Sequence, residues 1–339
     1  MDQLDTVYVT RPGTRLLLEE SALLVHLPDD GGRHRVPLLR VESIVAWGGV
    51  YISPDVMRRC ADLGIHITWI TQNGKLVATV TGTESGGGEL RLAQYRAHSN
   101  PEHRVDLARA FVHGKIHNYR TLLLRAGRDA TGARQRDLRQ IAARQGVALE
   151  QLPRAQSLSE VLGVEGRAAR DYFQHSHLLF TAFAPAGRSH RPPLDPANCC
   201  LSMGYALLRS STHAALVHVG LDPMIGYLHG VRGTKPSLAL DLMEEMRPLL
   251  VDRLVATLLN RGQIVPSKHM RRLPGGAWEF TPDGLSTFIN LWAESRTRDW
   301  NHAVQRRRLP ASHLPLIQAR LLARHLREPD FPYEPWTTA

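Results

Sequence analysis

A histidine and a cluster of acids lie close together in residues 220–253, whose sequence is GLDPMIGYLHGVRGTKPSLALDLMEEMRPLLVDR. His229 lies in a segment rich in Gly and Pro, whereas Asp241, Glu244 and Glu245 open what the pattern predicts to be a helix. His229 and Glu244 are 15 positions apart, so they are not neighbours on one helix and a turn must bring them together. An imidazole and a carboxylate at such a junction can bind a divalent metal that acts on a phosphate group.

The same residues also have an interpretation that needs no metal. Leu242, Met246, Leu249 and Leu250 follow the 3–4 spacing of a buried helical stripe. Acids in a first helical turn are stabilised by the positive end of the helix dipole. The spacing alone therefore leaves open a metal site or an ordinary amphipathic helix, and a metal site needs a third ligand.

Glu165 is the candidate for the third ligand, in the segment GVEGRAARDYF at residues 163–173. The small residues around it allow other helices to approach closely, so Glu165 can face inward; the alternative is a solvated glutamate near a helix start. Together with His229 and Glu244, it gives two carboxylates and one imidazole. This mixed ligand set suits Mg²⁺ or Mn²⁺, with water and phosphate oxygens completing the coordination.

Four motifs follow one another along the chain: EGRAARDYF, NCCLSMGYALL, GLDPMIGYLHG and SLALDLMEEMRP. They resemble the successive signatures of the CRISPR-associated integrase and endonuclease family of the spacer-acquisition machinery. The opening LDTVYVTRPGTRLLLEE and the later FVHGKIHNYR also resemble that family, so the resemblance extends roughly from Leu4 to Pro329. It implies an N-terminal β domain followed by a larger all-α catalytic domain.

The resemblance also implies an activity. It is that of a metal-dependent DNA integrase and endonuclease, which inserts foreign DNA fragments as new spacers into a CRISPR array by attack of a 3′-OH on a phosphodiester. The implied catalytic residues and metal ligands are Glu165, His229 and Glu244, with Mg²⁺ or Mn²⁺ as cofactor and Asp241 as a neighbouring acid that orients the site. The implied partners are double-stranded and branched DNA, a second copy of the chain in a homodimer, and a small companion adaptation protein.

The charge distribution agrees with a polyanionic partner. The chain of 339 residues has 42 Lys and Arg against 32 Asp and Glu, which gives a net charge of +10. Residues 91–145 contain 12 basic and 4 acidic residues, and residues 296–327 contain 8 basic residues and one acid, Asp299. Two separated basic blocks on either side of an acidic centre are what a nuclease needs, because cations hold the DNA backbone while acids hold the metal.

Four residues of the first basic block are candidates for DNA contacts: Arg96, Lys115, Asn118 and Arg120. Lys115 and Asn118 are three positions apart and therefore share a helical face. This face can contact backbone phosphates, or it can simply be a solvated surface.

The three cysteines, Cys60, Cys199 and Cys200, offer neither a disulfide framework nor a CxxC zinc motif. We expect buried free thiols in a reducing cytosol. The first residues lack the features of a secretory signal, and no apolar run approaches the roughly 20 residues that cross a bilayer. The expectation is a soluble cytoplasmic protein without a membrane partner.

The pattern changes once along the chain. Short β-forming segments separated by turn residues reach to about residue 83 and predict a small antiparallel sheet or sandwich. Ser53 to Gly64 interrupts them as one short helix with a Ser cap, Pro at its first position and Gly at its end. Residues 84–89 are the expected linker, and residues 90–339 the expected helical catalytic domain. The predicted fold class is α+β.

Two other functions remain as alternatives. A metal-dependent phosphohydrolase for small nucleotides can use the same ligands, but it does not need two basic blocks. A non-catalytic DNA-binding scaffold with a vestigial metal centre explains the charge without the chemistry.

Overall fold

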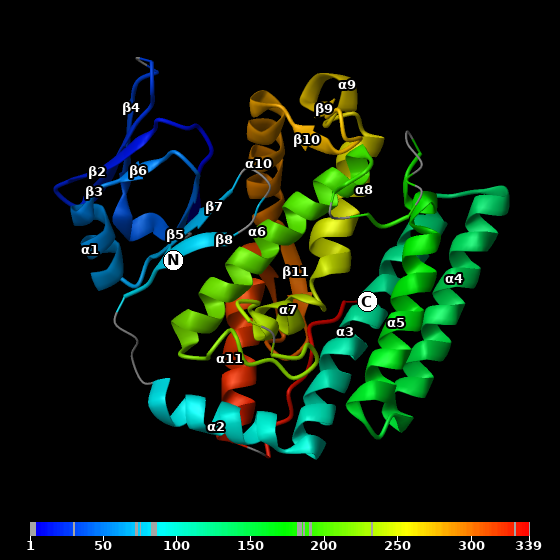
Figure 1. Ribbon diagram of the computed structural model, residues 1–339. Coiled ribbons are helices and arrows are strands. Elements are labelled where there is room, and N and C mark those ends of the chain that lie inside the picture. The colour runs from blue at the N-terminus through cyan, green and yellow to red at the C-terminus, as the bar shows by residue number, and fades with distance from the viewer. Residues whose placement is uncertain are drawn as a thin grey trace.

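The computed structural model describes residues 5–29, 31–71, 74, 76–82, 87–181, 185, 187–189, 192–231, 233–328 and 330–338. A strand-rich N-terminal part is followed by a larger, mostly helical part, and the two lie side by side (Figure 1). This order confirms the predicted α+β class. None of the helices in the described ranges combines the length and apolar character that a membrane span requires.

The N-terminal part contains two sheets of four strands each. Its strands are β1 (Asp5–Val9), β2 (Arg15–Glu19), β3 (Ala22–His26), β4 (Arg33–Pro37), β5 (Val41–Trp47), β6 (Tyr51–Ile52), β7 (His66–Ile70) and β8 (Leu76–Val80). The strand orders are β1-β5-β7-β8 and β4-β3-β2-β6. The expectation of purely antiparallel pairing is wrong, because β1–β5, β5–β7 and β2–β6 are parallel. The helix between β5 and β7 provides the crossover that parallel neighbours require.

That crossover helix is α1 (Pro54–Asp62), which confirms the helix predicted from Ser53 to Gly64. The Ser53 hydroxyl accepts a hydrogen bond from the Val56 N–H at 3.3 Å, and Gly64 follows the helix with a φ of +69°. Of the expected linker, residues 84–86 lie outside the described residues, whereas Gly87 and Gly88 already belong to the next helix.

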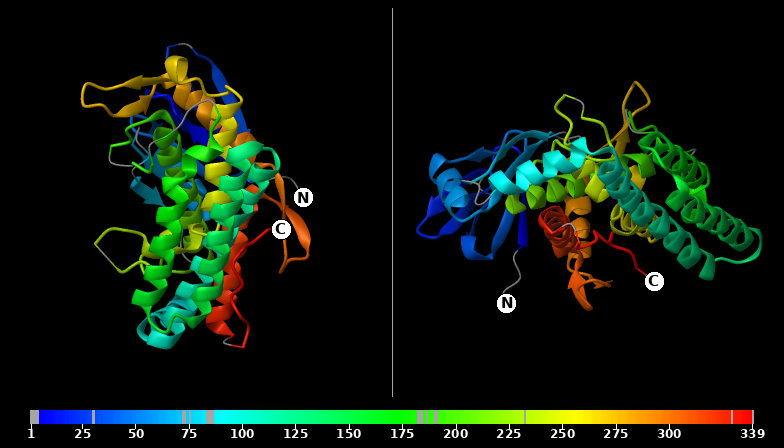
Figure 2. Two further views of the ribbon diagram at one scale, coloured as in Figure 1. Left: turned by 90° about the vertical axis from the view of Figure 1, so that its right-hand side faces the viewer. Right: turned by 90° about the horizontal axis from the view of Figure 1, so that it is seen from below.

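The helical part consists of a long bundle of α3, α4 and α5 and a second group of helices between that bundle and the sheets (Figures 1 and 2). Its α-helices are α2 (Gly87–Ser99), α3 (Pro101–Arg128), α4 (Gly132–Gln151), α5 (Leu158–Gln174), α6 (Pro196–Val219), α7 (Ser237–Met243), α8 (Arg253–Asn260), α9 (Pro266–His269), α10 (Pro282–Arg296) and α11 (Leu314–Arg327). The shorter elements are the π-helix η4 (Arg247–Asp252), the 3₁₀ turns η1 (Leu38–Arg40), η2 (Leu152–Arg154), η3 (Ser176–Leu179) and η5 (Ala311–His313), and the hairpins β9 (Met270–Arg272) with β10 (Trp278–Phe280) and β11 (Asp299–His302) with β12 (Arg307–Pro310).

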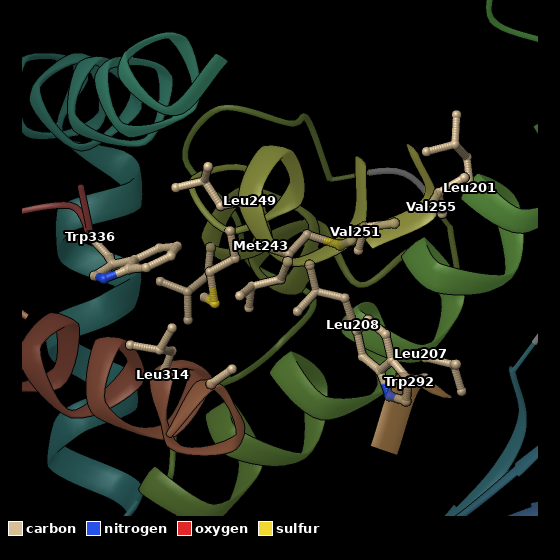
Figure 3. Close-up of a cluster of buried hydrophobic side chains, with 14 of the residues drawn as sticks. Leu201, Leu207, Leu208, Met243, Leu249, Val251, Val255, Trp292, Leu314 and Trp336 are labelled. Carbon is tan, nitrogen blue, oxygen red and sulfur yellow. The ribbon is translucent and has the colours of Figure 1, made fainter. Parts of the chain in front are cut away.

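The main core joins the two parts of the molecule. Figure 3 shows side chains from α6, α7, η4, α8, α10, α11 and the segment after α11 packed together. Val45, Trp47 and Ile70 of the N-terminal strands belong to the same buried cluster. In addition, the Trp292 indole N–H donates to the Tyr8 hydroxyl at 2.9 Å. The β domain is therefore packed against the helices rather than merely tethered to them.

The acids of residues 241–245 lie at the end of a helix, not at its start. Helix α7 begins at Ser237, and Glu244 follows its last residue as the C-cap. The explanation by acids in a first helical turn is therefore wrong. The predicted stripe is confirmed, because Leu242, Met246, Leu249 and Leu250 are all buried. Pro248 has no N–H to donate, which favours the irregular π-helical backbone of η4; such segments occur frequently at functional sites.

Gly114 lets α3 approach its neighbours closely. A Cβ atom at this position would lie 2.7 Å from Glu245 Cβ and 2.9 Å from Pro335 Cβ. We predict that Gly114→Ala lowers the free energy of unfolding by roughly 1–3 kcal/mol, because this overpacking outweighs the roughly 1 kcal/mol that Ala gains in a helix. Urea unfolding measures the change.

The matched control is Gly146→Ala in α4, where the added Cβ meets only the flexible Arg120 side chain, at 3.5 Å. This variant should be as stable as wild type or more stable. Equal stabilisation by both substitutions would contradict the close approach at Gly114.

Candidate metal centre

Two carboxylates from different helices converge on one ammonium group. Lys115 Nζ, on α3, lies 2.5 Å from Glu165 Oε1, on α5, and 2.7 Å from Glu244 Oε2. Glu165 therefore faces inward, as its small neighbours predicted, and it keeps only partial exposure. Figure 1 shows α3 and α5 side by side, with α7 next to α3. The sequence-predicted residues Glu165 and Glu244 are thus brought together, with a cation between them.

Glu244 is buried, with 1% of its side chain exposed, and needs positive neighbours. Burial alone raises the pKa of its carboxyl, but the charges of Arg247 and Lys115 outweigh burial and lower that pKa to about 2. Arg247 Nη1 lies 2.7 Å from Glu244 Oε1. The same carboxylates outweigh the burial of Lys115 and raise its pKa, so the ammonium stays charged. The carboxylate therefore stays ionised at neutral pH.

His229 is oriented by Asp241. The ring Nδ1 donates to Asp241 Oδ1 at 2.6 Å, because an ionised carboxylate can only accept. In the neutral ring, this bond fixes the tautomer and leaves Nε2 with its lone pair. Burial lowers the pKa of His229, but the hydrogen bond to Asp241 and the charge of Glu244 outweigh burial and raise it. His229 thus lies within the electrostatic reach of Glu244.

The backbone around His229 is held by the same acid. Asp241 is fully buried, and its carboxylate accepts the backbone N–H groups of Tyr227, Leu228 and His229 at 2.6 to 2.9 Å. Gly226 makes this approach feasible, since a Cβ there would lie 2.6 Å from Asp241 Oδ2. Leu228 packs into the core between α3 and α5, and so places His229 beside the helices that bear Lys115 and Glu165.

The donor set fits a hard divalent ion, whereas the side-chain arrangement is not a preformed cage. Within the described ranges, no three His, Cys, Asp or Glu side chains form a metal-binding cluster. Lys115 lies between the two carboxylates instead. Glu244 Oε2 is buried and has the Lys115 ammonium 2.7 Å away as its partner, so a divalent cation here would replace, or share the place of, a positive charge.

The four expected DNA-contact residues have different environments. Arg96 and Arg120 are exposed. Asn118 is fully buried, and its amide donates to the backbone carbonyls of Glu245 and Trp336 at 2.6 and 2.9 Å. Lys115 is buried between the two carboxylates. Lys115 and Asn118 therefore do not form a solvated face, because the segment after α11 and the acids cover them.

Sequence reasoning missed Arg247 and a buried acid beside it. Arg247 follows Glu244 at helical i,i+3 spacing, a signal that could have identified the pair. Asp252 accepts hydrogen bonds from the hydroxyls of Tyr172 at 2.9 Å and Tyr205 at 2.5 Å. These partners are 80 and 47 positions away, so no local pattern could have revealed them.

The cysteines take no part in this centre. All three are free and buried, as expected. Burial raises the pKa of the Cys60 thiol to about 11 and that of Cys199 to about 12, and it also raises that of Cys200. Protonated thiols are poor nucleophiles.

Asp252 generates a prediction about pH. Burial raises its pKa from 3.8 to about 6, even though the tyrosine hydroxyls lower it. Since the folded state holds this proton more tightly, the stabilisation is complete below about pH 3.8 and is lost as the pH rises through about 6. The unfolding free energy of wild type minus that of Asp252→Asn should therefore fall by about 2 kcal/mol between pH 4 and 6.5.

Urea titrations across that range measure the difference, and the exposed Asp299→Asn variant controls for the loss of a carboxylate. Parallel pH profiles for wild type and Asp252→Asn would refute the raised pKa.

The chain is similar to known proteins over nearly its whole length. The family model for CRISPR associated protein Cas1 matches residues 7–294. A curated relative from Rhodospirillum rubrum, named CRISPR-associated endonuclease Cas1 2, is 40% identical over 98% of both chains.

Solved structures share the fold. A Cas1 protein from Thermotoga maritima has a TM-score of 0.81 at 25% identity and covers 96% of this chain and 97% of its own. A casposase bound to integration product has a TM-score of 0.82 at 22% identity, over 98% and 93% of the two chains. A chain of a Cas6-RT-Cas1--Cas2 complex has a TM-score of 0.81 at 21% identity and covers 99% of this chain, which spans 36% of that one. By the family model and the curated relative, this chain belongs to the CRISPR-associated Cas1 family.

Proposed function

We propose that this protein is a metal-dependent DNA integrase and endonuclease, which inserts DNA fragments as new spacers into a CRISPR array. The nucleophile is the 3′-OH of the incoming fragment, and the bond attacked is a phosphodiester of the array; with water in place of that hydroxyl the same centre cuts DNA. The observation that carries the proposal is the convergence of Glu165 and Glu244 on one cation, beside an oriented His229. Relatives named endonucleases and a casposase of the same fold support it.

Glu165, His229 and Glu244 are the residues that would hold Mg²⁺ or Mn²⁺. When bound, the ion would supply Lewis-acid polarisation of the phosphate and would offset negative charge on the leaving oxygen. Asp241 keeps the His229 Nε2 lone pair available. Arg247 and Lys115 keep Glu244 ionised and therefore ready to act as a ligand. Both cations can also compensate the negative charge of a phosphate at this centre.

DNA and protein partners follow from the same proposal. The exposed Arg96 and Arg120 contact the backbone of double-stranded or branched DNA. The functional unit is a homodimer of this chain together with a small companion adaptation protein. A chain of a Cas6-RT-Cas1--Cas2 complex has the same fold, which supports an assembly with a companion protein.

One observation favours the non-catalytic scaffold as a second candidate. The Lys115 ammonium balances the two carboxylates without a metal, as a vestigial centre would. In that case the protein binds DNA and joins none.

Glu244→Ala separates the two candidates. We predict that this substitution lowers DNA joining by well over 10²-fold, because a ligand for the charge-neutralising ion is lost. The assay follows covalent insertion of a short duplex with free 3′-OH ends into a supercoiled, repeat-bearing plasmid. It contains the companion protein and either Mn²⁺ or EDTA.

The exposed Glu294→Ala variant is the control and should join DNA as wild type does. Joining that resists EDTA would exclude the metal mechanism. DNA binding without joining in every variant would establish the scaffold instead.

Lys115→Gln tests the metal ligands without relying on activity. Removal of the buried ammonium leaves Glu165 and Glu244 short of positive charge, so without metal the variant should lose about 3 kcal/mol of stability. Mn²⁺ no longer competes with the ammonium for these carboxylates. We therefore predict that Mn²⁺ raises the melting temperature more in Lys115→Gln than in wild type.

Thermal unfolding over a Mn²⁺ titration measures this difference, with the exposed Lys268→Gln as the matched control. If the melting temperature of all three proteins is the same with and without Mn²⁺, a metal at these carboxylates is ruled out.

A further inference from the structure

Three arginines surround one tryptophan away from the candidate metal centre. The guanidinium carbons of Arg253, Arg298 and Arg125 lie 5.3, 5.5 and 5.8 Å from the centre of the Trp300 ring. Trp300 lies on β11 and is itself buried. Cation–π contact with the ring holds the guanidinium groups in place although they repel one another.

A cavity of about 140 Å³ opens at this cluster. We call it the Trp300 pocket; four of its lining residues are arginines, namely Arg253, Arg261, Arg296 and Arg298. No described Asp or Glu lines it, and the lining shares no residue with the Glu244 ion pairs. Its volume exceeds that of the one or two waters that a small polar cavity holds, so a phosphate group fits.

The positive charge of the Trp300 pocket has few acidic neighbours: no described carboxylate lines the pocket, and the charge of Glu42 acts on Arg296. In the described part of the chain, no ion pair involves Arg253, Arg261 or Arg298. Arg296 is 8% exposed, and its Nη1 is buried without a hydrogen-bond partner. Burial and the neighbouring arginines lower the pKa of Arg253 to about 10. Arg296 is buried and Arg253 half-buried, whereas Arg261 and Arg298 are exposed. Guanidinium groups gathered in this way recognise phosphate oxygens.

The positive surface continues from the pocket onto a projecting hairpin. Arg298 directly precedes β11, and the exposed Arg306, Arg307 and Arg308 lie at the turn and on β12. Figure 2 shows this β11–β12 hairpin, in orange, standing out from the helical body. A line of arginines that extends beyond one cavity matches a repeating polyanion better than a single small anion.

We propose that the Trp300 pocket binds a backbone phosphate of duplex DNA and that the β11–β12 hairpin contacts the adjoining phosphates. This inference rests on the proposed action on DNA and adds to it a second contact, separate from the Glu244 centre. Arg253 and Arg298 grip the phosphate, and Trp300 keeps both guanidinium groups in position. The geometry thereby assigns a function to the second basic block.

The test is DNA affinity in EDTA, where no joining can occur. Arg253→Gln/Arg298→Gln should bind a short fluorescent duplex about 10-fold more weakly than wild type. The slope of log K against log salt should fall by about 1, as expected for one lost phosphate contact. The control, Arg33→Gln/Arg40→Gln, removes the same charge from exposed sites of the β domain and should stay within about two-fold of wild type. The exposed Arg298→Gln alone serves if the double variant does not fold.

Equal losses in the pocket and control variants, or no loss in either, would overturn the inference. A parallel titration with inorganic phosphate follows tryptophan fluorescence. Arg253-dependent phosphate binding with unchanged DNA affinity would identify a small-anion site and would likewise overturn it. The joining assay tests the proposed enzyme separately. If wild type joins DNA but the pocket substitutions do not weaken DNA binding, only this inference is contradicted. If the pocket substitutions weaken DNA binding but wild type joins no DNA, only the proposed enzymatic activity is contradicted.

Discussion

The structure depends on keeping one buried carboxylate ionised. An isolated charge in the position of Glu244 costs several kcal/mol, so it must be surrounded by opposite charge. Arg247 supplies one cation from the same stretch of backbone and Lys115 the other from α3, and Lys115 also recruits Glu165 from α5. This requirement fixes the relative positions of three helices. It also couples the local chemistry to the packing of the whole bundle.

Backbone irregularity provides the rest of the positioning. Glu244 and Glu245 lie in the turn between α7 and the π-helix η4, and their side chains meet different neighbours. Glu244 faces Lys115, and Glu245 faces the segment after α11, where the Tyr333 hydroxyl and the Trp336 N–H donate to it. Two adjacent acids thus perform different tasks, one in the candidate centre and one in the core.

Sequence patterns predicted what depends on local spacing. The Ser53 cap, the short strands, the buried stripe of residues 242–250 and the inward face of Glu165 all follow from periodicity and small neighbours. The parallel pairing of β5 with β7 did not follow, because strand direction depends on the path of the crossover. The burial of Lys115 and Asn118 was not predicted either, since the groups that cover them lie as many as 218 positions away in the sequence. The parallel pairing and the burial of these two residues depend on contacts between distant parts of the chain, not on local propensity.

Asn118 and Thr121 donate to the backbone carbonyls of Trp336 and Thr338, which are 218 and 217 positions further along the chain. The ribosome makes these acceptors after all the other elements described. Until then Asn118 has only the Glu245 carbonyl as a protein acceptor, and the Thr121 hydroxyl lacks its Thr338 acceptor. During translation, the packing on this side of α3, beside the candidate metal centre, is therefore the last to be completed.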